Sequence, residues 1–161
     1  MNGEISGLYA RPKRIYLAAR YSRRLELRGY RDQLEKCGHT VNGRWLDGAH
    51  QIDRYGLPIG DHGEALVEGG DEHRAAELRL KLAIDHFREV VSSEILVAFT
   101  EPPAGSGGRN RGGRHVELGI ALGRGMKVWV VGCRENLFTW LDGVQFFPTW
   151  DEAFERLNLS V

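Results

Sequence analysis

The chain has 161 residues, the size of one domain, so we expect residues 1–161 to fold as a single unit. Its 22 basic and 22 acidic side chains cancel, so no long-range field attracts a nucleic acid polymer or an anionic membrane. Apolar residues make up 42% and charged residues 27%, a balance that excludes wholesale disorder, and no apolar run is long enough to span a bilayer.

The amino-terminal third predicts a strand, a helix and a second strand. Residues 14–19 (RIYLAA) have the apolar pattern of a strand. Ser22 is a candidate cap for a helix that runs through Leu34 and ends at Gly38. Residues 39–46 alternate enough to predict a second strand, although Gly43 weakens that pattern.

The middle of the chain combines a long polar stretch with a long helix. Residues 47–70 have no sustained periodicity and exceed the usual connection length, which favours a lid or a binding loop. Residues 71–92 carry apolar side chains at helical spacing and predict an amphipathic helix that packs on a sheet. The members of this stripe are Ala76, Leu80, Ala83, Ile84, Phe87 and Val91.

The remaining elements complete an alternating order. Residues 94–99 and 127–131 are apolar runs typical of strands covered on both faces. Between them lie a glycine-rich loop, residues 100–114, and a short helix, residues 115–124. Residues 144–147 predict a further strand, and the Thr149-x-x-Glu152 capping box begins a last helix. This order predicts an α/β fold of flavodoxin or Rossmann type: a doubly wound, mainly parallel five-stranded sheet with helices on both faces.

Arginines gather in two loops that the fold places at the carboxyl edge of the sheet. They are Arg20, Arg23 and Arg24 after the first strand, and Arg109, Arg111 and Arg114 before the short helix. Helix amino termini and arginine side chains both bind anions, so a phosphate is the natural ligand. The alternative for any one of them is a solvated arginine on a loop.

Three other side chains have both a structural and a chemical interpretation. Glu117 lies where we expect the first turn of the short helix, so the helix dipole should keep it ionised at neutral pH. It is either an ordinary helix-start acid or a nucleophile for an anomeric carbon. Asp85 can pair on the helix surface with Lys81 or Arg88, and Tyr16 can be a core side chain.

Other kinds of site find little support in the sequence. The six histidines show no HExxH motif, and the two cysteines form no zinc-type spacing, so we expect no metal. GxSxG, GxxxxGK[ST] and GxGxxG motifs are absent from the sequence. The first 14 residues lack the apolar stretch of a secretory signal, which favours a cytoplasmic protein without disulfides.

Residues 113–131 (GRHVELGIALGRGMKVWVV) resemble the nucleoside 2-deoxyribosyltransferase superfamily, which includes 2'-deoxynucleoside 5'-monophosphate N-hydrolases and cytidylate N-glycosidases. The resemblance extends to residues 14–19, to AIDHF at 83–87, to SEILVAF at 93–99 and to ENLF at 135–138. These segments cover most of the chain in the same order. Residues 47–70 have no match in the family. Trp45 and this stretch are the candidates for the residues that select the base of the substrate.

The resemblance assigns roles to residues that patterns alone leave open. It implies that Glu117 is the nucleophile, Asp85 the acid near the departing base, and Tyr16 the side chain that positions the nucleophile. The substrate-binding candidates are Ala18, Arg20, Ser22, Arg23, Trp45, Arg111, Gly113, Arg114 and Asn136. It also implies no metal or organic cofactor, and a homodimer or higher oligomer in which Asn136 serves a partner's pocket.

The implied reaction is a double displacement at C1' of the sugar through a covalent glycosyl-Glu117 intermediate. Transferases of the family carry an acid six residues before the nucleophile, where this chain has Arg111, which favours a 5'-phosphate. The expected activity is therefore release of the base from a (2'-deoxy)nucleoside 5'-monophosphate.

Three alternatives stay open. One is base exchange on free deoxynucleosides. Another is a phosphoribohydrolase of the cytokinin-activating type, whose glycine motif residues 102–108 match only loosely. The third is a non-catalytic nucleotide sensor, in which the arginines bind and Glu117 only caps its helix.

Overall fold

The computed structural model describes residues 11–48, 72–101 and 112–159. The predicted lid or base-specificity loop at 47–70 falls almost entirely outside these residues. Arg109 and Arg111 also lie outside them, so their expected contacts with a phosphate remain predictions.

Five parallel strands form the centre of the molecule, and they confirm the predicted fold class. The sheet has the order β2-β1-β3-β4-β5, which is the flavodoxin-like order. All four neighbouring pairs are parallel, so the carboxyl ends of the strands lie at one edge. The strands are β1 (Arg14–Ala18), β2 (Thr40–Asn42), β3 (Ile95–Phe99), β4 (Lys127–Val131) and β5 (Val144–Phe147).

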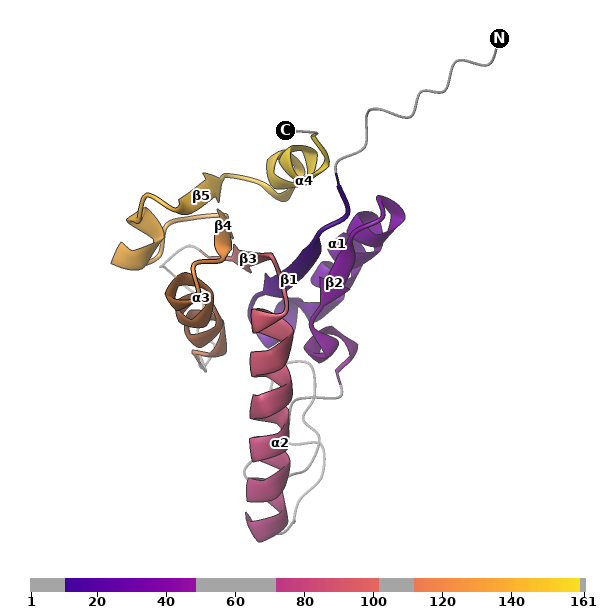
Figure 1. Ribbon diagram of the computed structural model, residues 1–161, viewed down its shortest axis with the longest axis vertical. Coiled ribbons are helices and arrows are strands. Elements are labelled where there is room, and N and C mark those ends of the chain that lie inside the picture. Colours follow the sequence, from indigo (N-terminus) through magenta and orange to yellow (C-terminus); the bar gives the residue numbers. More distant parts are fainter. Residues whose placement is uncertain (1–10, 49–71, 102–111, 160–161) are drawn as a thin grey trace.

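The helices cover both faces of this sheet. On one face, Trp150 donates its indole N–H to Gln33 at 2.7 Å and stacks on Tyr30, which joins α4 (Trp150–Asn158) to α1 (Arg24–Lys36). On the other face, α2 (Glu72–Val91) contacts α3 (Gly113–Gly123). Figure 1 shows α2 extending away from the sheet as a long rod.

The hydrophobic core lies along the middle strands. Every residue of β3 is buried, as its continuous apolar sequence predicts for a strand covered on both faces. The last four residues of both β1 and β4 are also buried. Because these strands are buried up to their last residues, the polar residues that follow them begin at the carboxyl edge of the sheet.

Several predicted ends are confirmed. Gly38 and Gly125 follow α1 and α3 with φ of +85° and +66°, backbone angles that favour glycine and end a helix. The capping box is also present, because the Thr149 hydroxyl accepts the backbone N–H of Glu152.

Two local predictions near the amino terminus are wrong. Ser22 does not cap α1: it lies within a 3₁₀ helix, η1 (Tyr21–Arg23), and the N-cap residue of α1 is Arg23. The second strand does not reach residue 46, because it ends at Asn42. Gly43 has a φ of +124° and turns the chain into a second 3₁₀ helix, η2 (Arg44–Asp47).

The apolar stripe of α2 is largely exposed, which corrects the expectation that the whole helix packs on the sheet. Leu80, Ile84 and Phe87 are 63%, 41% and 47% exposed, whereas Val90 in the last turn is fully buried. The helix is longer than the surface it covers (Figure 1), so only its carboxyl end contributes to the core.

Candidate active site

A tyrosine and a glutamate from distant parts of the chain meet beside the sheet. The Tyr16 hydroxyl donates a hydrogen bond of 2.6 Å to Oε1 of Glu117. Tyr16 is fully buried within β1, whereas Glu117 lies on α3 and is partly buried. The strand therefore supplies a fixed donor, and the helix supplies the carboxyl group.

The charge state of Glu117 differs from the expectation. Because α3 begins at Gly113, Glu117 lies in the second turn, beyond the strongest influence of the helix dipole. Burial raises the pKa of its carboxyl to about 7, although the Tyr16 hydrogen bond and the Arg114 charge both act to lower that pKa. The carboxyl is therefore poised between its charged and neutral forms near neutral pH, rather than fully ionised.

The Tyr16 hydroxyl stays protonated and remains a donor. Burial raises the pKa of the Tyr16 phenol well above its ordinary value, and the negative charge of Glu117 raises it further. A short bond from a neutral hydroxyl to a carboxylate stabilises the charged form of the carboxylate and fixes one of its oxygens.

Arg114 is buried and acts as a tether. Its guanidinium donates to the Phe99 carbonyl at 3.1 Å and to Oε2 of Glu135 at 2.6 Å. The other carboxylate oxygen of Glu135 accepts the backbone N–H of Glu101 at 3.0 Å. These contacts hold the start of α3 against the ends of β3 and β4. Gly113, the neighbouring candidate, is exposed as the first residue of α3.

Two of the three arginines after β1, Arg20 and Arg23, already have acidic partners. Arg20 pairs with Glu101 at 2.7 Å. Arg23 makes two hydrogen bonds to Glu26, at 2.8 and 2.7 Å. Together with the Arg114 pair, these contacts partly neutralise the positive charge that the sequence places at this edge. Of the other candidates nearby, Ser22 is exposed in η1 and Ala18 is buried as the last residue of β1.

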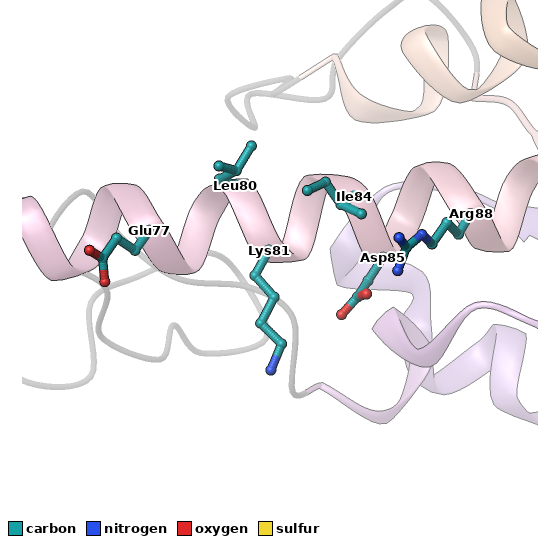
Figure 2. Close-up of a pocket in the computed structure, with 6 residues that line it drawn as sticks. All are labelled: Glu77, Leu80, Lys81, Ile84, Asp85 and Arg88. Carbon is teal, nitrogen blue, oxygen red and sulfur yellow. The ribbon is translucent and has the colours of Figure 1, made fainter.

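Asp85 has a different partner from the predicted one. Its carboxylate pairs with Arg44 of η2 at 3.2 Å rather than with Lys81 or Arg88 of its own helix. Figure 2 shows Lys81 and Asp85 pointing to one side of α2 and Leu80 to the other. A hollow of about 390 Å³ runs along this part of the helix and is lined by Glu77, Leu80, Lys81, Ile84, Asp85 and Arg88.

Sequence reasoning did not select Arg44 or Glu89. Arg44 binds Glu89 through Nε at 2.6 Å, and its backbone N–H donates to the same carboxylate at 3.3 Å. Glu89 follows Asp85 by four residues, so helical spacing places both acids on one side of α2 and could have drawn attention to Glu89. No pattern in the sequence relates Arg44 to either acid.

Two further candidates have structural contacts. Trp45 is only 4% exposed in η2, and its indole N–H donates to the Leu17 carbonyl at 3.1 Å. Asn136 caps η3 (Leu137–Trp140), a 3₁₀ helix that the sequence analysis did not predict, by accepting the backbone N–H of Phe138 at 3.0 Å. The expected roles of Trp45 at the base and Asn136 at a partner's pocket remain predictions.

Within residues 11–48, 72–101 and 112–159, no three His, Cys, Asp or Glu side chains gather as a metal site. Cys37 and Cys133 are both free thiols. In the same part of the chain, no helix combines the length and apolar character needed to cross a membrane.

Comparisons with known proteins add one structural likeness. No protein-family model and no curated protein matches the sequence. Among solved structures, the chain is similar to the CMP N-glycosidase BcmB from Clostridium botulinum, with 16% identity and a TM-score of 0.47. The similarity covers 90% of this chain and 98% of the other.

Proposed function

We propose that this protein is an enzyme that cleaves the N-glycosidic bond of a (2'-deoxy)nucleoside 5'-monophosphate and releases the free base. The observation that carries the proposal is the 2.6 Å hydrogen bond from Tyr16 to Glu117. A carboxylate held by a fixed donor at the ligand-binding edge of a parallel sheet is suited to attack an anomeric carbon. The resemblance of residues 113–131 to nucleoside 2-deoxyribosyltransferases points to the same chemistry.

In the first step of the proposed reaction, an oxygen of the Glu117 carboxylate attacks C1' of the sugar. The bond from C1' to the base nitrogen breaks, and its electron pair leaves with the base, which takes up a proton. In the second step, water attacks C1', loses a proton and releases the sugar from Glu117. Tyr16 keeps the second carboxylate oxygen in place throughout.

Asp85 is the proposed group for handling the proton at the base. Its ion pair with Arg44 defines where the carboxylate lies, and Asp85 lines the hollow beside α2, where the base is proposed to bind. Trp45 is proposed to support the base pocket from the core side, and Asn136 to complete the pocket of a second subunit.

A phosphate on the 5' carbon is the proposed ligand of the arginines near the end of β1. Arg20, Ser22 and Arg23 follow that strand directly, Arg111 precedes α3 in the sequence, and Arg114 is the second residue of that helix. A phosphate monoester carries about 1.5 to 2 negative charges at pH 7, against one for a carboxylate, so in this proposal the substrate would replace Glu101 on Arg20.

The acidic partners of these arginines favour a second candidate, base exchange on unphosphorylated deoxynucleosides. With Arg20 paired to Glu101 and Arg23 paired to Glu26, this edge carries less positive charge than the sequence suggests. A free 5' hydroxyl would then be accepted without displacing an ion pair.

The test is chromatography of free base from a panel of ribonucleosides, deoxynucleosides and their 5'-monophosphates, with and without a second base. Release from monophosphates without acceptor supports the nucleotide hydrolase. Exchange on unphosphorylated deoxynucleosides supports the transferase. Absence of turnover with every substrate, together with equal nucleotide binding by the wild type and Glu117→Ala, would support the non-catalytic sensor.

We also propose that the enzyme works as a homodimer or higher homo-oligomer. Leu137, Phe138 and Trp140 of η3 are 86%, 65% and 67% exposed, and Leu80, Ile84 and Phe87 of α2 are exposed apolar side chains elsewhere on the chain. Patches of this kind mark association sites in many proteins. Analytical ultracentrifugation at micromolar concentration tests this, and a monomer across the concentration range would reject it.

A further inference from the structure

Glu135 follows β4 and binds two other segments of the chain. Its Oε2 accepts a hydrogen bond from the Arg114 guanidinium at 2.6 Å, and its Oε1 accepts the backbone N–H of Glu101 at 3.0 Å. Glu101 lies two residues beyond the end of β3, and Arg114 is the second residue of α3. One carboxylate therefore ties the end of β3 to the start of α3.

The backbone on both sides of Glu135 is anchored. The Thr100 hydroxyl accepts the backbone N–H of Cys133 at 2.7 Å and donates to the Cys133 carbonyl at 2.6 Å. Gly132, with a φ of +114°, lets the chain pass Thr100 so closely that an added Cβ would lie 2.8 Å from its carbonyl oxygen. On the other side, Asn136 is the N-cap residue of η3. Glu135 is therefore a fixed point from which other elements can be aligned.

The Arg114 guanidinium lies between two acceptors and is withdrawn from water. The side chain of Arg114 is 6% exposed and that of Glu135 is 18% exposed. One terminal nitrogen donates to the Phe99 carbonyl at 3.1 Å, and the other donates to Glu135. The forked donor set of arginine serves two acceptors at once, and a buried guanidinium that loses its counterion is strongly destabilised. Loss of Glu135 would therefore displace Arg114 toward water.

Glu117 lies about one turn beyond Arg114 on the same helix. Residues three apart in a helix are neighbours on its surface, so both side chains lie on one side of α3. Each makes a hydrogen bond to the sheet: Arg114 to the carbonyl of Phe99 in β3, and Glu117 to the hydroxyl of Tyr16 in β1. Two such contacts at successive turns fix the rotation of α3 about its axis.

A small rotation of α3 is enough to separate Glu117 from Tyr16. The end of a side chain lies about 6 Å from the helix axis, so a rotation of about 10° moves it by about 1 Å. An increase of that size would lengthen the 2.6 Å contact beyond the range of a hydrogen bond. The apolar contacts of α3, made by the buried Leu118 and Ala121, are not directional and would keep the helix on the sheet. Loss of Glu135 should therefore turn α3 rather than unfold the chain.

We propose that Glu135 is a positioning residue for the nucleophile: through Arg114 it fixes the orientation of α3 that brings the Glu117 carboxyl to the Tyr16 hydroxyl. The inference rests on the proposed function for its catalytic consequence. The positional effect itself does not depend on any reaction and can be measured without substrate.

The test uses ¹⁹F NMR of protein labelled with 3-fluorotyrosine, at pH 8. Tyr16→Phe assigns the Tyr16 signal, and Glu117→Ala gives its position when the hydrogen bond to Glu117 is absent. Glu135→Ala removes the acceptor of Arg114 and should move the Tyr16 signal at least halfway to its position in Glu117→Ala. Arg114→Lys keeps the charge but cannot donate to Phe99 and Glu135 together, so it should move the signal in the same direction.

Glu94→Ala is the matched control. One carboxylate oxygen of Glu94 accepts the Arg14 backbone N–H at 3.0 Å, and the other binds the guanidinium of Arg11, so the contacts resemble those of Glu135. Glu94 precedes β3, at the opposite edge of the sheet, and its loss should leave the Tyr16 signal in place. A wild-type Tyr16 signal in Glu135→Ala, with the fold intact by circular dichroism, would overturn the proposal. If Glu135→Ala does not fold, an unshifted signal in Arg114→Lys would overturn it.

Kinetics separate this inference from the proposed function. In an active enzyme, Glu135→Ala should lower kcat for base release about tenfold and change KM less than about threefold, because it displaces the nucleophile. Tyr16→Phe leaves the Arg114 tether in place, so its loss should recover by pH 9, whereas the loss in Glu135→Ala should persist. A shifted Tyr16 signal in a protein that releases no base would keep the positional role and reject the glycosidase. Base release by Glu135→Ala with the wild-type kcat at pH 9 would overturn the inference and keep the glycosidase.

Discussion

Replacing Glu117 with glutamine should stabilise the protein at alkaline pH. In the folded protein burial raises the carboxyl pKa from 4.5 to about 7, so the folded state holds a proton that the unfolded chain releases. Stability is therefore lost as the pH rises from about 4.5 through 7. The glutamine variant keeps the hydrogen bond from Tyr16, because its amide oxygen accepts, and removes the cost of a buried charge.

The size of this effect follows from the shift. A difference of about 2.5 pKa units corresponds to about 3 kcal/mol when the pH is above both values. Between pH 5 and pH 8, the stability difference between Glu117→Gln and the wild type should grow by about 2–3 kcal/mol. For a chain of this length, that growth corresponds to about 5–10 °C in Tm.

Urea unfolding at pH 5, 6, 7 and 8 measures the difference directly. Glu94→Gln is a control in which the pKa is shifted in the opposite direction, because the Arg14 backbone N–H keeps the pKa of Glu94 below its ordinary value. Its effect should be destabilising and nearly constant from pH 5 to pH 8, since both of its pKa values lie below this range. A Glu117→Gln difference that stays flat with pH would refute the raised pKa assigned to Glu117.

Tyr16→Phe removes the hydrogen bond that favours the charged form of Glu117. In the proposed reaction, the acid limb of kcat/KM should therefore rise by about one pH unit, and activity at pH 7 should fall about fivefold and recover by pH 9. Tyr30→Phe breaks a comparable bond on α1 and should not move this limb; equal shifts would contradict the assignment. Gly132→Ala should lower the unfolding free energy by about 1–3 kcal/mol, because φ is +114° and the new Cβ would lie 2.8 Å from a carbonyl oxygen after β3. Gly125→Ala, with φ of +66° and open space around it, should cost less, as urea midpoints would report. His39 loses its favourable neutral state in acid, because burial lowers its pKa below 6.5; the stability of the wild type relative to His39→Gln should therefore fall from pH 7 to pH 5.

The sheet was predictable because its strands are coded by local apolar runs. The predicted strand at 94–99 begins one residue before β3, and the one at 127–131 matches β4. The glycines after α1 and α3 mark the ends of those helices. The second strand was overestimated because alternation cannot report a φ of +124° at Gly43. The stripe of α2 predicts a helix correctly, but periodicity does not say how much partner surface the helix meets.

The residues of the candidate site could be predicted from the sequence better than the contacts that they make. Resemblance selected Tyr16 and Glu117, and the structure brings them within 2.6 Å. The prediction that Glu117 is fully ionised at neutral pH was wrong. Its charge state depends on burial and on a helix that begins two residues earlier than the sequence pattern indicates. The predicted partner of Asp85 was wrong because Arg44 is distant in the sequence, and local sequence rules do not predict pairs of residues that meet only in the folded protein.

Tyr16 and Glu117 are 101 positions apart in the sequence, and this separation has a consequence for folding. Their hydrogen bond needs β1, β3 and α3 to be in place, and non-local contacts of this kind close late because loop entropy must be overcome first. The titration of Glu117 can therefore serve as a built-in reporter of the final stage of folding. In a chain whose helices have formed but whose sheet has not, Glu117 would have the pKa of an ordinary glutamate. Its pKa would rise only when the native topology is complete.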